Sequence, residues 1–304
     1  MSLLTVGTVA FDAIETPFGK VDKIVGGAAT YISIAASYFN KDVKIVSVVG
    51  DDFPQGDMDD LKKRGVDLEG LQIKKGEKSF FWSGKYHDNM NKRDTLVTDL
   101  NVLADFDPVL PESYKKVDYL MLGNLTPAVQ MRVLQQMKKR PKLVAMDTMN
   151  FWMDIAMDEL KSVIKKVDVL TNNDEEARQL SGKYSLVSAA KEIFTMGPKF
   201  LVIKKGEHGA LLFYKDEIFF APALPLETVY DPTGAGDTFA GGFMGYMSQA
   251  GRVSFANMKR GMIYGSALAS FCVEKFGTEA IKPLSRKQID DRVAQFAKLV
   301  QFSK

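Results

Sequence analysis

Short apolar runs recur along the chain, and segments with a helical spacing of apolar residues separate many of them. Continuous apolar runs of this length are typical of strands that are buried on both faces. The predicted strands are Leu3–Ala10, Val43–Gly50, Val117–Gly123, Leu143–Asp147, Val167–Thr171 and Phe200–Lys204. The predicted helices include Ala28–Phe39, Pro127–Lys139, Asp154–Lys165, Phe255–Phe276 and Ser285–Phe302. Strands that alternate with helices predict an α/β fold, with a mainly parallel central sheet covered on both faces.

A second kind of pattern runs from Glu77 to Val97, where large apolar and polar residues alternate. If this segment is a strand, Phe80, Trp82 and Tyr86 share one face. That face is too apolar for an open sheet edge, so we expect either ordinary core or a surface that another element covers. The segment Ala13–Val25, with Pro17 and Gly19, also predicts extended structure.

Composition is that of an ordinary globular protein. The 304 residues are 46% hydrophobic and 26% charged, with a net charge of +2. This near balance, without a dense basic run, argues against nucleic-acid binding. No apolar run is long enough for a membrane span and no secretion signal is visible, so we expect a cytoplasmic protein that does not bind membranes. The single Cys272 and the two histidines offer neither a disulfide nor a zinc spacing. We find no linker, and therefore expect one domain over residues 1–304.

The stretch Asp231–Phe243 joins a turn of small residues to an apolar helix. Gly234, Ala235 and Gly236 leave the backbone N–H groups open to an anion, and a helix N-terminus favours negative charge. A carboxylate at Asp237 would repel a phosphate, so its presence at this turn needs another partner. The proton of an attacking hydroxyl is such a partner, which makes Asp237 a candidate general base. The alternative is a turn in which Asp237 caps the helix.

These thirteen residues resemble the PfkB family of carbohydrate and nucleoside kinases, also called ribokinase-like. The resemblance implies an ATP-dependent kinase in which Asp237 is the catalytic base and Gly234–Gly236 form an anion hole. It implies a ribokinase-like three-layer α/β/α fold with a small β-sheet lid, formed by about residues 13–25 and 72–98. The lid would cover the substrate, pack against the lid of a second subunit in a homodimer, or do both.

The same resemblance assigns a substrate site near the N-terminus. Asp12 is predicted at the carboxyl end of the first strand, where ligands bind in open α/β sheets, and the family uses an Asp there to hold substrate hydroxyls. Gly26 and Gly27 match the paired glycines near the family's sugar site. Tyr31 is a departure, because an Asn usually stands there in the relatives that bind sugars. Tyr31 either contacts the substrate or packs inside the protein.

Further positions match the family's nucleotide and metal sites. Asn173 and Glu176 fit its Asn-x-x-Glu motif, associated with Mg²⁺ and phosphate, although acids that open a helix are also favoured by the helix dipole alone. One carboxylate acting partly through water suffices for Mg²⁺. The resemblance places Lys204 and Gly206 beside the phosphates or ribose of ATP, and Gly277 at the border of the adenine pocket.

Three further positions remain open. Asp231 and Thr233 match positions that bind a monovalent cation such as K⁺ in some relatives. The turn Asp147–Asn150 lies at a strand end, where it lines the cleft or serves as a structural cap.

The predicted activity is transfer of the γ-phosphate of ATP to a hydroxyl of a small sugar or sugar-like substrate. A nucleoside kinase of the same fold is the alternative, since the lid aromatics could stack on a base. A sugar- or nucleoside-binding regulator without catalysis is a further alternative. Neither the G-x-x-x-x-G-K-S/T loop nor the G-x-G-x-x-G fingerprint is present, which argues against P-loop and Rossmann enzymes.

Overall fold

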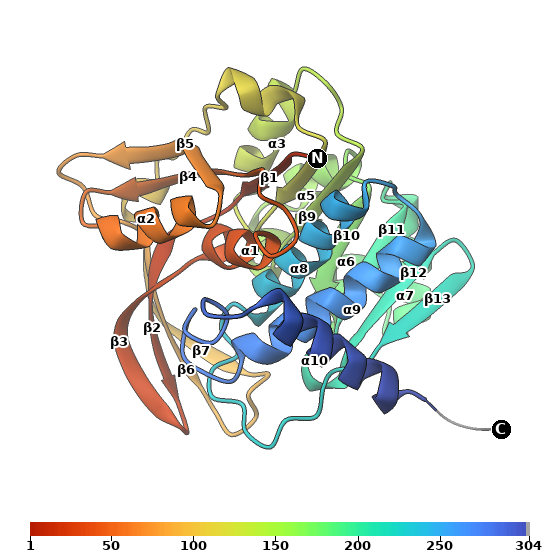
Figure 1. Cartoon of the computed structure of the whole chain (residues 1–304). Coiled ribbons are helices and arrows are strands. Elements are labelled where there is room, and N and C mark those ends of the chain that lie inside the picture. The colour runs from red at the N-terminus through yellow and green to blue at the C-terminus, as the bar shows by residue number, and fades with distance from the viewer. Residues whose placement is uncertain (302–304) are drawn as a thin grey trace.

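A computed structural model describes residues 1–301, so the predicted helix end at Phe302 lies outside the described residues. Nine strands form a large sheet in the order β13-β12-β11-β10-β9-β8-β1-β4-β5 (Figure 1). The pairs from β11 to β5 are parallel, and β12 and β13 add an antiparallel edge. The strands are β1 (Leu3–Val6), β4 (Val43–Gly50), β5 (Val66–Lys74), β8 (Tyr119–Leu122), β9 (Leu143–Asp147), β10 (Val169–Asn173), β11 (Phe200–Lys204), β12 (Ala210–Tyr214) and β13 (Glu217–Ala221).

Helices cover both faces of this sheet, which confirms the three-layer α/β/α prediction. Strand β9 shows why the strands are apolar throughout: Leu143 and Ala145 enter one core, while Val144 and Met146 enter the other. One face carries α1 (Ala28–Ala36), α2 (Gln55–Lys63), α8 (Ala235–Ala250), α9 (Phe255–Cys272) and, outside them, α10 (Arg286–Leu299). The other carries α3 (Pro127–Gln136), α4 (Asn150–Ile155), α5 (Met157–Ile164), α6 (Asp174–Ser181) and α7 (Leu186–Thr195). Short 3₁₀ turns are η1 (Asn101–Leu103), η2 (Glu112–Lys116) and η3 (Gly206–His208).

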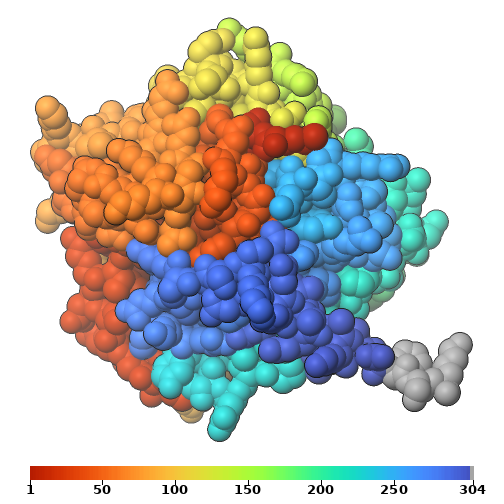
Figure 2. Space-filling view, in the orientation of Figure 1, coloured from red at the N-terminus to blue at the C-terminus, as the bar shows by residue number. Residues whose placement is uncertain are grey.

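A second sheet of four strands, in the order β3-β2-β6-β7, projects beside the large one (Figure 1). We call it the lid. Its strands are β2 (Ala10–Thr16), β3 (Gly19–Gly26), β6 (Phe81–Tyr86) and β7 (Arg93–Asp99). The lid is assembled from two separate parts of the chain, residues 10–26 and 81–99. In Figure 2, the C-terminal part of the chain, in blue, lies between the N-terminal part, in red and orange, and the segment near residue 220, in cyan.

Several predicted boundaries are wrong. The run Leu3–Ala10 is not one strand, because β1 ends at Val6 and the chain turns at Gly7 into the lid. A side chain at Gly7 would meet the backbone N of Ala29 at 2.9 Å, so the close approach of α1 accompanies this turn. Residues 72–74 belong to β5 of the large sheet and not to the lid.

One predicted helix is also divided. The segment Asp154–Lys165 is split between α4 and α5, because Ala156 leaves the helical conformation at φ −145° and ψ 38°. Within residues 1–301, no helix has the length and apolar character needed to cross a membrane.

Candidate active site

The turn that opens α8 is held in its shape by Gly234. Gly234 is the N-cap with φ 74°, in the left-handed region that favours glycine, and no side chain caps the helix. The N–H of Ala235 donates to the Pro232 carbonyl at 3.1 Å. The N–H groups of Gly236 and Asp237, which have no intrahelical acceptor, are the ones open to an anion. Asp237 is the third residue of the helix, so the alternative in which it caps α8 is wrong. The turn has the form of an anion-binding site.

Asp237 lies half-buried at this turn. The pKa of its carboxyl is raised to about 7, chiefly by burial and also by the charge of Asp147, while Lys204 and Arg93 act in the opposite direction. A carboxylate whose pKa lies near neutral pH is suited to accept a proton from a hydroxyl group. The geometry and the charge surroundings thus agree with a general base at Asp237.

Asp12 lies on the lid side of the same space. It is inside β2 and not at the carboxyl end of β1 as predicted, because the chain has already left the large sheet. A side chain at Gly26 would collide with the carboxylate of Asp12, so the glycine makes room for it. Burial raises the pKa of Asp12 to about 7, with the charges of Asp231 and Asp237 adding to the effect and a hydrogen bond from the Gly27 backbone opposing it. Asp12 and Asp237 therefore face a common space.

Tyr31 lies beneath this space and not in it. Its ring is 1% exposed and packs directly under Gly234, where a side chain on the glycine would collide with it. The hydroxyl is buried and has no hydrogen-bond partner among residues 1–301. Of the two alternatives for Tyr31, the structure favours packing, since the ring fills the volume below the turn and leaves no accessible surface for a substrate.

Asn173 and Glu176 lie at the start of α6. They form a capping box in which the Asn173 side chain accepts from the Glu176 N–H at 2.8 Å and the Glu176 carboxylate accepts from the Asn173 N–H at 2.7 Å. The pKa of Glu176 is raised to about 7, chiefly by burial and also by the nearby charge of Asp147, while the charge of Lys204 opposes the shift. Within the described chain, no three His, Cys, Asp or Glu side chains gather as a metal site. A single carboxylate with phosphate and water as further ligands still fits Mg²⁺.

Lys204 ends β11, and its ammonium donates to the carboxylate of Asp147 at the end of β9, at 2.7 Å. A side chain on Gly236 would lie 3.2 Å from the Lys204 Nζ, so the ammonium is directly beside the anion-binding turn. The sequence left the role of Asp147 open. The structure brings it beside Lys204, because β9 and β11 flank β10 and end at the same edge of the sheet.

The lid reaches this edge through Tyr86. Its hydroxyl accepts a hydrogen bond from the Thr233 hydroxyl at 3.1 Å. Arg93 stands opposite Tyr86 in the β6–β7 register, so both side chains lie on the face toward α8. Trp82 is on the same face, is paired in register with Asp12, and lies 5.6 Å from the Arg93 guanidinium carbon, measured to the ring centroid. Sequence reasoning missed Arg93, for which only its place after an aromatic strand gave a signal.

Asp231 joins two loops behind the site. One carboxylate oxygen accepts from the Thr233 N–H at 2.8 Å and the other from the Gly277 N–H at 2.9 Å. Gly277 is therefore adjacent to Asp231 and Thr233, while Gly206 lies in η3 and contacts the lid residue Asn91. The monovalent-cation site and the adenine pocket stay predictions.

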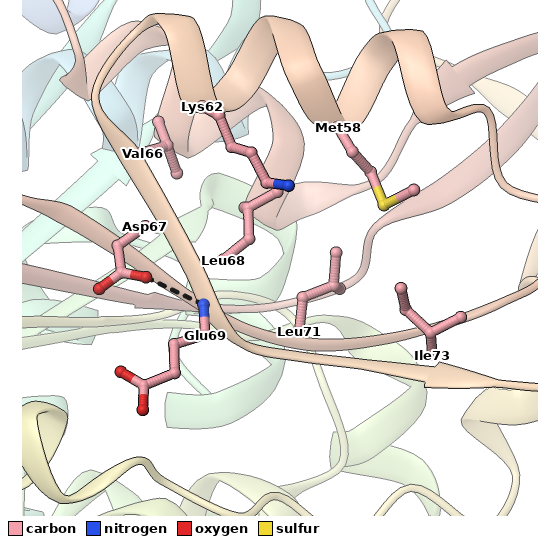
Figure 3. A pocket seen from close by; sticks show the side chains of 8 residues that line it. All are labelled: Met58, Lys62, Val66, Asp67, Leu68, Glu69, Leu71 and Ile73. Carbon is pink, nitrogen blue, oxygen red and sulfur yellow. Dashed lines mark hydrogen bonds between the residues drawn. The ribbon is translucent and has the colours of Figure 1, made fainter.

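Two grooves lie apart from this chemistry. A groove of about 470 Å³ between α2 and β5 contains none of the predicted site residues (Figure 3). A second of about 440 Å³ includes Gly277 but none of the catalytic candidates. The candidate site is thus defined by converging polar groups at the sheet edge and not by either of these grooves.

The sequence and the fold are similar to those of known kinases. The profile of the pfkB family carbohydrate kinases matches residues 2–284. A cytidine kinase from Thermococcus kodakarensis is 30% identical over 80% of this chain and 87% of its own length. A nucleoside kinase from Methanothermobacter thermautotrophicus is 26% identical over 97% of this chain and 96% of its own. The structure of a ribokinase-like protein from E. coli, in complex with ATP and Mg²⁺, has a TM-score of 0.80 at 19% identity, with 97% of this chain and 99% of that chain covered.

Proposed function

Because the chain belongs to the pfkB family of carbohydrate kinases, we propose that it phosphorylates a hydroxyl group on the ribose of a nucleoside. The broader activity follows from the family: the protein is an ATP-dependent kinase that uses Mg²⁺ and has a sugar or a nucleoside as its acceptor. The choice between these two acceptors is the proposal.

The observation that carries the proposal is the position of Trp82 beside Asp12. Strands β2 and β6 are parallel and in register at these two residues, so Trp82 starts from the strand position beside the residue that would hold ribose hydroxyls, and its indole lies over Gly84. The stacking of a base on an aromatic side chain contributes ~1–3 kcal/mol. A free sugar has no aromatic ring that would stack on this surface in the same way. The similarity to a cytidine kinase and a nucleoside kinase over most of the chain supports the same acceptor.

Phosphoryl transfer requires mainly alignment and charge stabilisation. In the proposed mechanism, Asp12 orients the acceptor so that Asp237 removes the proton of the attacking hydroxyl. Within the Gly234–Gly236 turn, the N–H of Ala235 is bonded to the Pro232 carbonyl, so the N–H of Gly236 and the Lys204 ammonium beside it stabilise the negative charge that develops on the transferred group. Mg²⁺, when bound, neutralises phosphate charge, and Glu176 would hold it partly through water.

ADP formation from Mg-ATP against a mixed panel of nucleosides, sugars and sugar phosphates tests the proposal. We expect turnover with a nucleoside, and expect Trp82→Ala to raise its KM about tenfold or more through the lost stacking. Phe220→Ala is the matched control, because Phe220 is an aromatic residue in β13, the edge strand of the large sheet, and is 50% exposed. Turnover confined to sugars would overturn the nucleoside proposal and leave the kinase intact.

The exposed apolar residues Leu96 and Val97 support a further proposal, that two chains associate through their lids as a homodimer. Sedimentation analysis over a range of concentrations tests it, and a monomer at every concentration would contradict it. The use of ATP supports a cytoplasmic location.

A further inference from the structure

Asp147 and Lys204 form a largely buried ion pair at the sheet edge. The exposed fractions of their side chains are 8% and 19%, and the distance between Nζ and Oδ2 is 2.7 Å. The second carboxylate oxygen of Asp147 accepts from the N–H of Thr148 at 3.0 Å. Both oxygens are therefore engaged, and the carboxylate is fixed relative to β9.

The ammonium of Lys204 is fixed in turn by this carboxylate. A lysine side chain has a flexible four-carbon stem, so without a partner its ammonium would sample many positions. Here the Nζ lies beside the first turn of α8, within 3.2 Å of the place that a side chain on Gly236 would take. An ammonium carries three donors, and the bond to Asp147 uses one. The others remain for an anion at the turn.

We propose that Asp147 is a positioning residue that holds the Lys204 ammonium beside Gly236, where it contacts the phosphoryl group during transfer. This inference rests on the proposed function. Asp147 itself touches neither ATP nor the acceptor; it acts through Lys204.

Another buried aspartate in the protein shows what an ordinary structural pair looks like. Asp168 also has an 8% exposed side chain, but its partners Lys199 and Arg140 are 70% and 56% exposed. It precedes β10 at the opposite edge of the sheet, where its carboxylate accepts from the Val144 N–H. Asp168 is thus a matched control: the same residue type and the same burial, far from the anion-binding turn.

The test measures kcat and KM for wild type, Asp147→Asn, Lys204→Met, the double variant and Asp168→Asn. We expect Asp147→Asn to lower kcat about tenfold or more, the scale of a lost hydrogen bond to a charged group, with little change in the KM of the acceptor. The double variant should be no slower than Lys204→Met alone, because Asp147 acts only through the lysine. Asp168→Asn should keep wild-type kcat.

Folding is checked separately, since Lys204→Met leaves a buried carboxylate without its partner. The double variant removes both charges, so its urea unfolding midpoint shows whether the site can fold without the pair. An unchanged kcat in Asp147→Asn would overturn the inference. So would additive losses in the double variant, an equal loss in Asp168→Asn, or recovery of Asp147→Asn by excess Mg²⁺, which would place Asp147 on the metal. Absence of turnover in the wild type with every acceptor would instead contradict the proposed function.

Discussion

Replacing Gly236 by Ala should stabilise the protein and slow the enzyme at the same time. Gly236 is the second residue of α8, and it is absent from the glycines with positive φ. Alanine favours a helix over glycine by roughly 0.5–1 kcal/mol, so the free energy of unfolding should rise by up to that amount. The new methyl group would, however, lie 3.2 Å from the Lys204 Nζ.

That distance is shorter than an ordinary van der Waals contact, so the ammonium must move by a few tenths of an ångström. Asp147 holds it from the other side, which limits where it can go. If the move weakens one charge-assisted hydrogen bond to the transferred group by ~1–2 kcal/mol, kcat falls about 5- to 30-fold. The KM of the acceptor should change little, because the methyl group is not on the side of Asp12.

Two further glycine-to-alanine variants serve as controls for this prediction. Gly56 is the second residue of α2, and nothing lies within 4 Å of a side chain added there, so Gly56→Ala should gain stability at wild-type kcat. Gly234→Ala should lose both activity and stability, because φ is +74° and the methyl group would collide with the buried Tyr31 ring. Steady-state kinetics and urea unfolding measure the two quantities. A wild-type kcat for Gly236→Ala, or a fall in its unfolding midpoint, would refute the reasoning about Lys204.

Three further predictions concern the acids and the lid. The value of kcat/KM should fall about tenfold per pH unit below the Asp237 pKa of about 7, because a general base must be unprotonated; a flat profile from pH 5 to 8 would contradict this. The folded protein binds protons at Asp237 between the unfolded pKa of 3.8 and the folded pKa of about 7, so its stability falls as the pH rises through that window. Asp237→Asn should therefore be more stable than wild type by up to ~4 kcal/mol at pH 8, from a pKa shift of about 3 units, and equal to it near pH 4. A loss of stability at pH 8 in urea unfolding would oppose the assignment. Tyr86→Phe removes the oxygen that accepts the hydrogen bond of the Thr233 hydroxyl, and the weakened lid contact should raise the KM of the phosphoryl acceptor about two- to tenfold at a nearly constant unfolding midpoint. An unchanged KM would mean that this contact does not help to close the lid over the substrate.

Much of the fold could be predicted from the sequence because the large sheet is buried on both faces. Strand β9 has the predicted bounds Leu143–Asp147, since its residues must be apolar on both sides and the surrounding residues are not. Boundaries that depend on tertiary contacts could not be predicted in this way. The turn at Gly7 depends on the approach of α1, and neither it nor the break at Ala156 interrupts the apolar pattern.

The residues of the candidate site differ in the same way: some are contiguous in the chain, and others are brought together only by the tertiary fold. Gly234, Gly236 and Asp237 could be found because they are contiguous in the chain and their chemistry is carried by a single turn. The pair of Asp147 and Lys204 could not be, because 57 residues separate the two and only the strand order brings them together. The sequence could not decide whether Tyr31 contacts the substrate or packs inside the protein, because either role places an aromatic residue near the turn at Gly234.

The most direct test of the account is ADP formation from Mg-ATP and the acceptor, measured for wild type and for Asp237→Asn at pH 8. The account predicts a loss of ~10²–10⁴ in kcat, the range for a general base, in a variant that remains folded and still binds ATP. Near-normal turnover by the purified variant, with contaminating kinases excluded, would contradict the assignment of Asp237 and with it the proposed mechanism.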